Sequence, residues 1–230
     1  MRCIAICLAG LVSALAVGCG SPAPPQPDAD PPKERAAALA KQVREAMTEP
    51  SIMQLDFDAG RAAASGGLRG IRQREAARPV VRQLVRCGKV AEEPLWRLIN
   101  DADASVRLSC VILLGEARTD AGGKPIESRT LVDLNISLLE RALTSKDAQV
   151  RYFASARLGD FAIWSDECLE RLRSSLPKLR ELRNDGDKEV RSVGWIACNG
   201  ILAELSARAK KPADRKAAAD EWKQLQREKW

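Results

Sequence analysis

The 230-residue sequence predicts an all-α fold in which helical hairpins stack into an α-solenoid. The pattern Asp-x-x-Val-Arg occurs three times, at residues 103–107, 147–151 and 187–191. Its valines are 44 and 40 residues apart, a spacing typical of paired-helix repeats. Aromatic residues make up only 4% of the chain, so the core must consist mostly of Leu, Val, Ile and Ala. Runs that alternate apolar and polar residues, as strands do, are almost absent.

The first 18 residues have the features of a signal peptide. Met1 and Arg2 form a short positive region, and residues 3–17 carry no charge. This apolar stretch is too short, and too rich in Ala and Gly, to be a comfortable membrane span, but it suits a secretion signal. We therefore expect residues 1–18 to be removed and the remainder to be exported.

The residues around the expected cleavage site are Leu15, Ala16, Val17, Gly18 and Cys19. They resemble the lipobox of bacterial lipoproteins, although Ala16 stands where Leu, Val or Ile is commonest. The resemblance implies that Cys19 is lipidated and becomes the new N-terminus. The alternative is an ordinary signal peptide with an incidental cysteine at its cleavage site. Several acyl chains on one residue make membrane attachment stable, whereas a single chain holds only marginally.

Residues 19–32 combine this cysteine with a proline-rich linker. Half of the chain's 12 prolines fall within residues 20–32. Such a segment favours an extended polyproline conformation and spans roughly 40 Å, which predicts a spacer; a ligand for a proline-binding groove is the alternative. No acidic residue follows Cys19 directly, and the lipoprotein resemblance then implies the outer membrane, or its periplasmic face, in a host with two membranes.

Helices are predicted along the rest of the chain. Residues 33–88 contain two, at 32–48 and 68–87, which are compatible with a degenerate repeat. The repeat domain, residues 89–208, contains three hairpins whose first helices are predicted at 92–100, 130–143 and 165–183. Each is followed by a helix with an Asp suited to cap it, namely Asp103, Asp147 or Asp187. Residues 119–128 are predicted to be a surface loop rather than a phosphate-binding loop, because the spacing of a phosphate-binding loop is missing.

The second helices resemble those of HEAT-like repeats, in which Asp-x-x-Val-Arg is followed by small residues and Leu-Gly. Leu114-Gly115 and Leu158-Gly159 fit this form, whereas the third repeat departs from it at Cys198. The resemblance implies a charge ladder in which the arginines pair with the capping aspartates of adjacent repeats. Binding of an anionic ligand is the other interpretation. The ladder consists of Asp103, Arg107, Asp147, Arg151, Asp187 and Arg191.

Three residues are candidates for protein binding. Tyr152, Arg157 and Trp195 lie on second helices, which the HEAT resemblance places on the concave surface of a solenoid. Their residue types are enriched among binding hot spots. Burial against a neighbouring repeat is the alternative for all three.

The last segment, residues 209–230, is predicted to be a capping helix from 212 to 230. It presents Ala218, Trp222 and Leu225 on one face, which suits it to cover the apolar end of the stack. The alternative is a basic amphipathic helix that lies on lipid through Trp222 and Trp230.

The composition argues against several kinds of chemistry. The chain has no histidine, which excludes His-dependent catalysis and His metal ligation, and no CxxC pair supports a zinc or dithiol site. We expect no metal or cofactor and no evident small-molecule substrate. The cysteines at 87, 110, 168 and 198 are expected to be mainly free, buried thiols, with a disulfide between Cys87 and Cys110 as the alternative. The net charge of +6 is interspersed with acids, which argues against nucleic acid as a partner.

These observations predict an exported, membrane-anchored envelope lipoprotein whose HEAT-like repeats form a non-enzymatic scaffold for binding another protein. Two other classes remain open. One is an enzyme of the lyase or glycosylase type, since both occur among HEAT-like proteins. The other is a structural envelope protein without a specific ligand.

Overall fold

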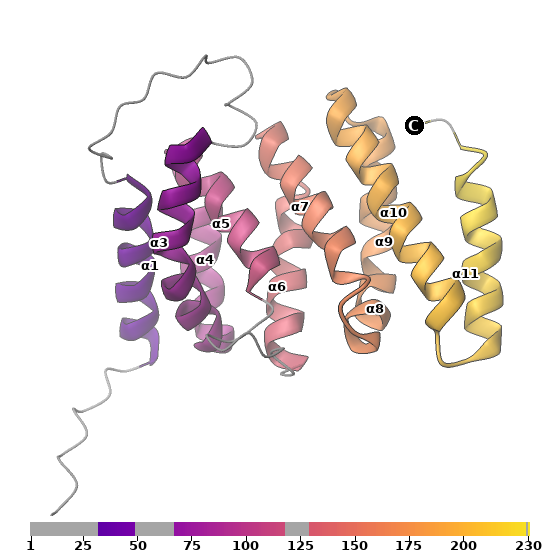
Figure 1. Ribbon diagram of the computed structural model, residues 1–230, viewed down its shortest axis with the longest axis horizontal. Coiled ribbons are helices and arrows are strands. Elements are labelled where there is room, and N and C mark those ends of the chain that lie inside the picture. The colour runs from indigo at the N-terminus through magenta and orange to yellow at the C-terminus, as the bar shows by residue number, and fades with distance from the viewer. Residues whose placement is uncertain (1–31, 49–66, 118–128, 229) are drawn as a thin grey trace, which may run out of the picture.

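The computed structural model describes residues 32–48, 67–117, 129–228 and 230, and the regular structure in those residues is entirely helical (Figure 1). The expected signal peptide, Cys19, the proline-rich linker and the loop at 119–128 lie outside the described residues. None of the described helices is both long and apolar enough to cross a membrane. The helices are α1 (Pro32–Thr48), α3 (Gly67–Arg86), α4 (Glu92–Ile99), α5 (Ala104–Glu116), α6 (Arg129–Ala142), α7 (Ala148–Phe161), α8 (Asp166–Leu172), α9 (Leu176–Glu181), α10 (Lys188–Arg208) and α11 (Pro212–Leu225), with 3-10 turns η1 (Gly88–Ala91), η2 (Arg173–Ser175) and η3 (Leu182–Asn184).

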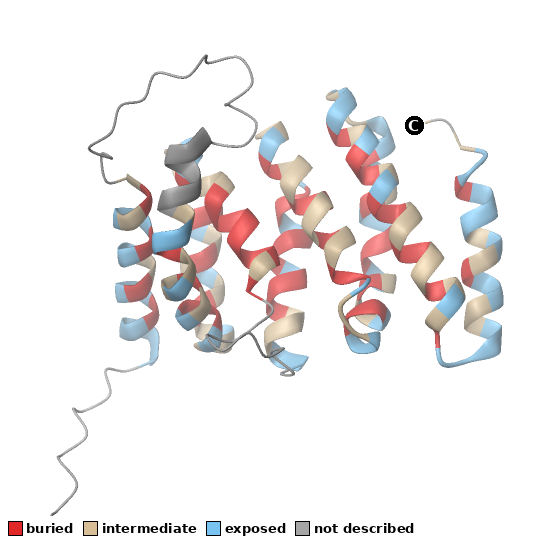
Figure 2. Cartoon of the chain, viewed as in Figure 1, coloured by how far each residue is buried: buried red, intermediate tan, exposed pale blue. Residues whose placement is uncertain are grey.

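The helices stack in two rows. Helices α3, α5, α7 and α10 pack on one another in sequence, and α4, α6 and α8 form the second row. Figure 1 shows the hairpins side by side, with α1 at one end of the stack and α11 at the other. Buried residues from neighbouring helices form a hydrophobic core cluster, and Figure 2 marks buried residues in red along the stack. The predicted all-α solenoid is therefore confirmed.

An aspartate precedes each second helix and caps it. Asp103 accepts hydrogen bonds from the amides of Ser105 and Val106, Asp147 from Gln149, and Asp187 from Glu189 and Val190. These amides have no carbonyl partner within the helix, so each cap stabilises a helix start. The three caps fix where the second helices begin, and thus the repeat length.

The segment predicted as one helix at 165–183 is divided. It consists of α8, the 3-10 turn η2, α9 and a further 3-10 turn, η3. Pro177 lies in the first turn of α9 and has no amide hydrogen, so it cannot donate to the carbonyl four residues earlier. The tighter turn η2 falls directly before this position. A proline in the middle of a predicted helix was the signal for this break.

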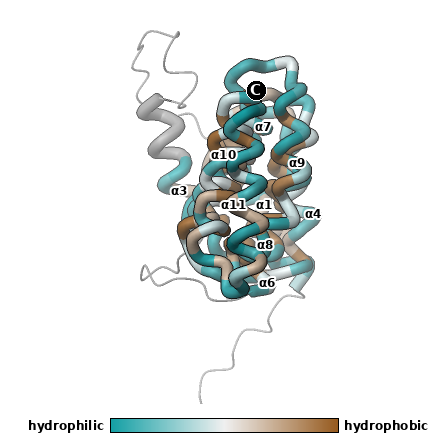
Figure 3. The backbone as a smooth tube through the Cα atoms, turned by 90° about the vertical axis from the view of Figure 1, so that its right-hand side faces the viewer, coloured by the Kyte–Doolittle hydropathy of each residue, from teal (hydrophilic) through white to brown (hydrophobic). Residues whose placement is uncertain are grey.

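The C-terminal segment also differs from its prediction. Helix α11 ends at Leu225 rather than at 230, and the chain returns so that Trp230 lies against Gly194 of α10. Ala218 and Leu225 are buried, but Trp222 is 36% exposed. Figure 3 views the stack from this end, with α11 in front, packed on α10. Trp230, rather than Trp222, supplies the aromatic side chain that packs against the core.

Candidate functional site

Ion pairs join the turns that precede successive second helices. Arg107 on α5 donates from Nη2 to Asp147 Oδ2 at 2.7 Å, across to the next hairpin. Its Nη1 donates to the carbonyl oxygen of Asp101 at 2.7 Å, in its own turn. One guanidinium thus binds both the turn before its own helix and the turn of the following hairpin.

The next pair differs from the ladder that the HEAT resemblance implies. Arg151 on α7 pairs with Asp185, not with Asp187, and donates from Nε and Nη2 to both carboxylate oxygens at 2.7 Å. Asp187 is instead occupied with capping α10. In the preceding hairpin, Ser145 occupies the position equivalent to Asp185 and carries no charge. Arg107 therefore pairs with the capping Asp147 itself.

At the start of the repeats, the residue two positions before the capping aspartate also forms an ion pair. Asp101 accepts from Arg44 Nε of α1 at 2.8 Å and from the amide of Asp103 at 2.9 Å. Asp103 therefore caps α5, while Asp101 forms the ion pair with Arg44. Asp101, Asp185 and Arg44 are members of the ladder that the sequence interpretation missed. The repeated Asp-x-Asp at 101–103 and 185–187 was the available signal.

These environments lower the pKa of the carboxylates. For Asp185 the largest cause is the hydrogen bond from Arg151. For Asp147 and Asp101 burial alone would raise the pKa, but hydrogen bonds from an arginine and from backbone amides outweigh it and lower the pKa. All three are therefore held as carboxylates, which suits a structural role.

Arg191, the last arginine of the series, binds the turn before its own helix but has no ion pair with a carboxylate among the described residues. Arg191 donates from Nη1 to the carbonyl oxygen of Asp185 at 2.6 Å, as Arg107 does in its own turn. Among the described residues, no carboxylate lies within ion-pair distance of Arg191. Within the described residues, α10 is followed by the single helix α11.

A cavity of about 390 Å³ adjoins this arginine, and we call it the C-terminal cavity. Two tryptophans, two basic residues and one acid contribute to its walls. The acid, Glu228, accepts from Gln224 through Oε1, whereas its buried Oε2 has no hydrogen-bond partner and lies 3.9 Å from Arg183. The lining residues are Lys188, Arg191, Ser192, Trp195, Gln226, Glu228 and Trp230.

An exposed apolar side chain, Ile196, lies on α10 next to this cavity. Ile196 follows Ser192 by one helical turn, so the two share a face, and Ile196 is 57% exposed. Asn199, on the same face, accepts from Trp222 Nε1 at 2.8 Å and from Gln226. Two of the three large apolar side chains exposed in the described part of the chain, Ile196 and Trp222, therefore lie on this surface. We call it the α10–α11 surface.

The three candidate binding residues lie apart. Trp195 lines the C-terminal cavity. Tyr152 is half-buried and packs edge-on against Phe153, with the ring centroids 5.2 Å apart. Arg157 lies over Gly115 of α5 and pairs with Asp160 at 2.7 Å. Arg157 thus packs between hairpins, and only Trp195 belongs to a cavity among those described.

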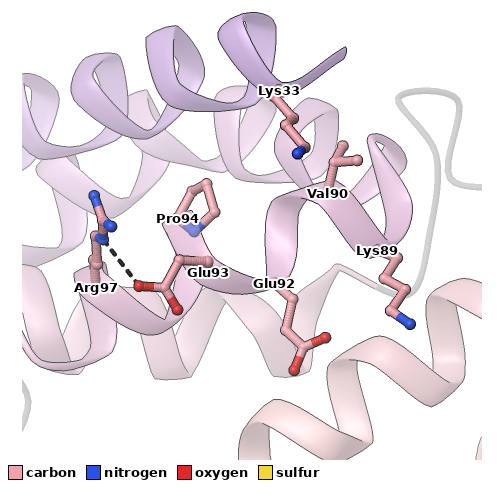
Figure 4. Close-up of a pocket in the computed structure, with 7 residues that line it drawn as sticks. All are labelled: Lys33, Lys89, Val90, Glu92, Glu93, Pro94 and Arg97. Carbon is pink, nitrogen blue, oxygen red and sulfur yellow. Dashed lines mark hydrogen bonds and ion pairs between the residues drawn. The ribbon is translucent and has the colours of Figure 1, made fainter.

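A second cavity, of about 470 Å³, lies at the opposite end of the stack and is lined by Lys33, Lys89, Val90, Glu92, Glu93, Pro94 and Arg97 (Figure 4). Its charges are of both signs. Arg97 donates to Glu93 at 3.0 Å, one turn away on α4, and Lys33 of α1 lies near Val90 in Figure 4. Three basic and two acidic side chains line this cavity, and one of each, Arg97 and Glu93, is paired.

The four cysteines in the described part of the chain form no disulfide with one another. Cys110, Cys168 and Cys198 are buried, while Cys87 is half-buried. Burial raises the pKa of Cys110 and of Cys198 to about 12, so neither is a thiolate at neutral pH. In the described part of the chain, no group of three or more Cys, Asp or Glu residues could hold a metal ion.

Comparison with known proteins finds likeness only among solved structures. No protein-family model matches the chain, and no curated protein matches it. An engineered protein is 18% identical, with a TM-score of 0.43 over 81% of this chain and 77% of its own. A computationally designed armadillo repeat protein for modular peptide recognition is 17% identical, with a TM-score of 0.39 over 82% and 95%. Another designed armadillo protein, in complex with the peptide (KR)4, is 15% identical, with a TM-score of 0.38 over 83% and 98%.

Proposed function

We propose that this protein is a non-enzymatic scaffold that binds another protein through its α10–α11 surface. The observation that carries the proposal is that two exposed apolar side chains, Ile196 and Trp222, adjoin a cavity walled by Trp195 and Trp230. Exposed apolar residues gathered beside aromatic pockets are typical of protein-binding surfaces. The firmly packed hairpins behind them supply a pre-organised support, which lowers the entropic cost of binding.

The N-terminal residues extend this proposal to a location. Residues 1–18 act as a secretion signal, and Cys19 carries the lipid that holds the protein at an envelope membrane, in the outer membrane of a host that has two. The features that support this are the uncharged stretch at 3–17, the lipobox-like residues before Cys19 and the prolines that follow it. The scaffold would then meet partners that are themselves exported.

Crosslinking in cells tests the binding function. The full chain carrying an affinity tag is crosslinked and purified as the native sequence, as Ile196→Asp, and as Ile163→Asp. Ile163 is 68% exposed and lies in the turn after α7, so it is a matched control outside the α10–α11 surface. We expect one reproducible partner with the native chain and with Ile163→Asp, and its loss with Ile196→Asp.

Recovery of abundant neighbours alone, unchanged by Ile196→Asp, would instead support a structural role and contradict the proposal. Thermal unfolding of each variant shows that the loss does not come from unfolding. Both replacements are at exposed sites, where a change of side chain has little effect on stability.

A further inference from the structure

Arg191, the arginine at the C-terminal end of the ladder, makes fewer hydrogen bonds through its guanidinium group than Arg107 and Arg151 do. Arg107 and Arg151 each use Nη1 for the turn before their own helix and Nε with Nη2 for a carboxylate of the next hairpin. Arg191 uses Nη1 in the same way. Its Nε and Nη2 have no carboxylate partner among the described residues. The two filled positions therefore define what the third would accept.

The filled positions specify a carboxylate on a short side chain. Both partners are aspartates in a turn before a helix, held at 2.7 Å. The planar guanidinium donates two parallel hydrogen bonds, an arrangement that favours carboxylates over other acceptors. At Asp185 both carboxylate oxygens are used in this way.

The surroundings of Arg191 favour an acidic ligand with an apolar neighbour. Lys188 is exposed and adds a second positive charge. Glu228, the acid in the wall, offsets one of these two positive charges, which leaves an excess of one positive charge among the lining side chains. Trp195 and Trp230 offer apolar walls beside the two cations. The cavity is therefore complementary to an acid followed or preceded by an apolar side chain.

We propose that the C-terminal cavity binds an acidic peptide segment of a partner protein. An Asp or Glu carboxylate of this segment accepts hydrogen bonds from Nε and Nη2 of Arg191. An adjacent apolar side chain of the segment packs on Trp195 and Trp230. This inference rests on the proposed scaffold function and names the chemistry of its partner. The α10–α11 surface would then hold the remainder of the segment along Ile196.

A second copy of this chain is a poorer occupant. Three aspartates of the ladder already have arginine partners: Asp101 binds Arg44, Asp147 binds Arg107, and Asp185 binds Arg151. Asp103 and Asp187 accept hydrogen bonds from the amides that they cap. Stacking two copies end to end through a ladder aspartate would therefore compete with one of these interactions. An external acid requires no such loss.

Fluorescence anisotropy with defined peptides tests the proposal. The probe is a short fluorescein-labelled peptide with Leu-Asp-Asp-Leu between glycines, and its counterpart has Leu-Asn-Asn-Leu. The full chain is used in detergent, as the native sequence and as Arg191→Lys and Arg191→Gln. We expect the Asn peptide and both variants to bind at least about tenfold more weakly, since each removes a charge-assisted hydrogen bond.

Arg151→Lys is the matched control, because it changes a filled position of the same ladder. It should lower the melting temperature and leave peptide binding unchanged. The proposal is overturned if the Asp and Asn peptides bind equally, or if Arg191→Gln binds the Asp peptide as the native chain does. It is also overturned if the native chain is a dimer that Arg191→Gln converts to a monomer, since the occupant is then a second copy.

Failure of this inference can be distinguished from failure of the proposed function. If crosslinking recovers a partner that depends on Ile196 but not on Arg191, the scaffold function stands and the acidic-segment inference fails. If no partner depends on Ile196, the scaffold function fails, whatever the peptides do.

Discussion

At the scale of single residues, Glu140 is a buried carboxylate that links the second hairpin to the third. It lies on α6 with only 8% of its side chain exposed. It accepts from Arg171 at 2.9 Å, from Ser175 at 2.6 Å and from Lys178 at 3.2 Å. Burial alone would raise its pKa, but these three hydrogen bonds outweigh burial and lower the pKa. The charged form is therefore the one that stabilises the fold.

Glu140→Gln should destabilise the protein in a pH-dependent way. At pH 7 the charge-assisted bonds are lost, at a cost of about 2 kcal/mol in the free energy of unfolding. The folded pKa lies below the unfolded value of about 4.3, so this stabilisation is present above that pH and disappears as the pH falls through the folded pKa. Chemical denaturation of both proteins from pH 7 to pH 3 measures it. The difference in stability must narrow on acidification; a constant difference would contradict the assignment.

Two helical glycines provide a matched test of packing. A methyl group at Gly115 would lie 2.2 Å from Arg157 Cδ and 2.8 Å from its Cβ, whereas one at Gly200 would meet nothing within 4 Å. Gly115→Ala should therefore displace Arg157 from Asp160 and cost about 1–3 kcal/mol. Gly200→Ala should stabilise by about 0.5–1 kcal/mol, because alanine favours helix more than glycine does. Urea unfolding measures both. Equal effects of the two replacements would show that Arg157 does not pack on Gly115.

At the scale of elements, the ion pair between Arg151 and Asp185 joins α7 to the turn before α10. Its side chains are 17% and 8% exposed, so water screens the pair less than it does a surface pair. Asp185 also accepts a hydrogen bond from the amide of Asp187. Replacing Asp185 alone would therefore remove both this hydrogen bond and the ion pair with Arg151. The coupling between the hairpins is thus best isolated with a double-mutant cycle.

The cycle uses Arg151→Ala, Asp185→Ala and the double variant, with Lys41 and Glu45 replaced in the same way as a control. We expect a coupling energy of about 1–2 kcal/mol for the first pair. The control pair on α1 is 79% and 58% exposed and should couple close to zero. A coupling for Arg151 and Asp185 as small as the control value would mean that the ladder does not hold the hairpins together.

The elements that the sequence predicted well have local causes. The boundaries of α1 agreed to the residue, and those of α5, α7 and α10 followed from the capping aspartates at 103, 147 and 187. The break at η2 and the return of Trp230 to α10 were missed for different reasons. The first had a local cause in Pro177 that received too little weight, whereas the second depends on a contact with Gly194. A contact between positions 194 and 230 leaves no periodic pattern in the sequence.

The candidate site was predictable only in part. Trp195 was singled out by its residue type, and the arginines by their repetition. The sequence could not predict that Arg191 has no carboxylate partner among the described residues. This depends on which residue of the following hairpin pairs with each arginine of the series. That identity changes between hairpins, because Ser145 replaces an aspartate in the middle one. A repeated motif alone could not indicate that Arg107 and Arg151 take their carboxylates from different positions.

At the scale of the whole molecule, the first described helix, α1, and the proposed binding surface lie at opposite ends of the stack. Helix α1 directly follows the proline-rich linker and begins the stack, whereas α10 and α11 end it (Figure 1). The filled ion pairs run from Arg44 through Arg107 to Arg151, and the series ends on an unfilled arginine. The geometry suits a scaffold that is anchored at one end and presents its binding surface at the other.

Replacement of Cys19 tests the anchored end. The native chain, Cys19→Ser and Cys7→Ser are expressed with labelled palmitate, and membranes are separated from soluble envelope contents. We expect label and membrane association for the native chain and for Cys7→Ser, because Cys7 lies in the segment that is removed. Cys19→Ser should lose both, because the diacylglyceryl group is attached through that thiol. Since several acyl chains hold a protein firmly, membrane association of an unlabelled Cys19→Ser chain from which residues 1–18 had been removed would assign attachment to α11 with Trp222, and to Trp230, instead.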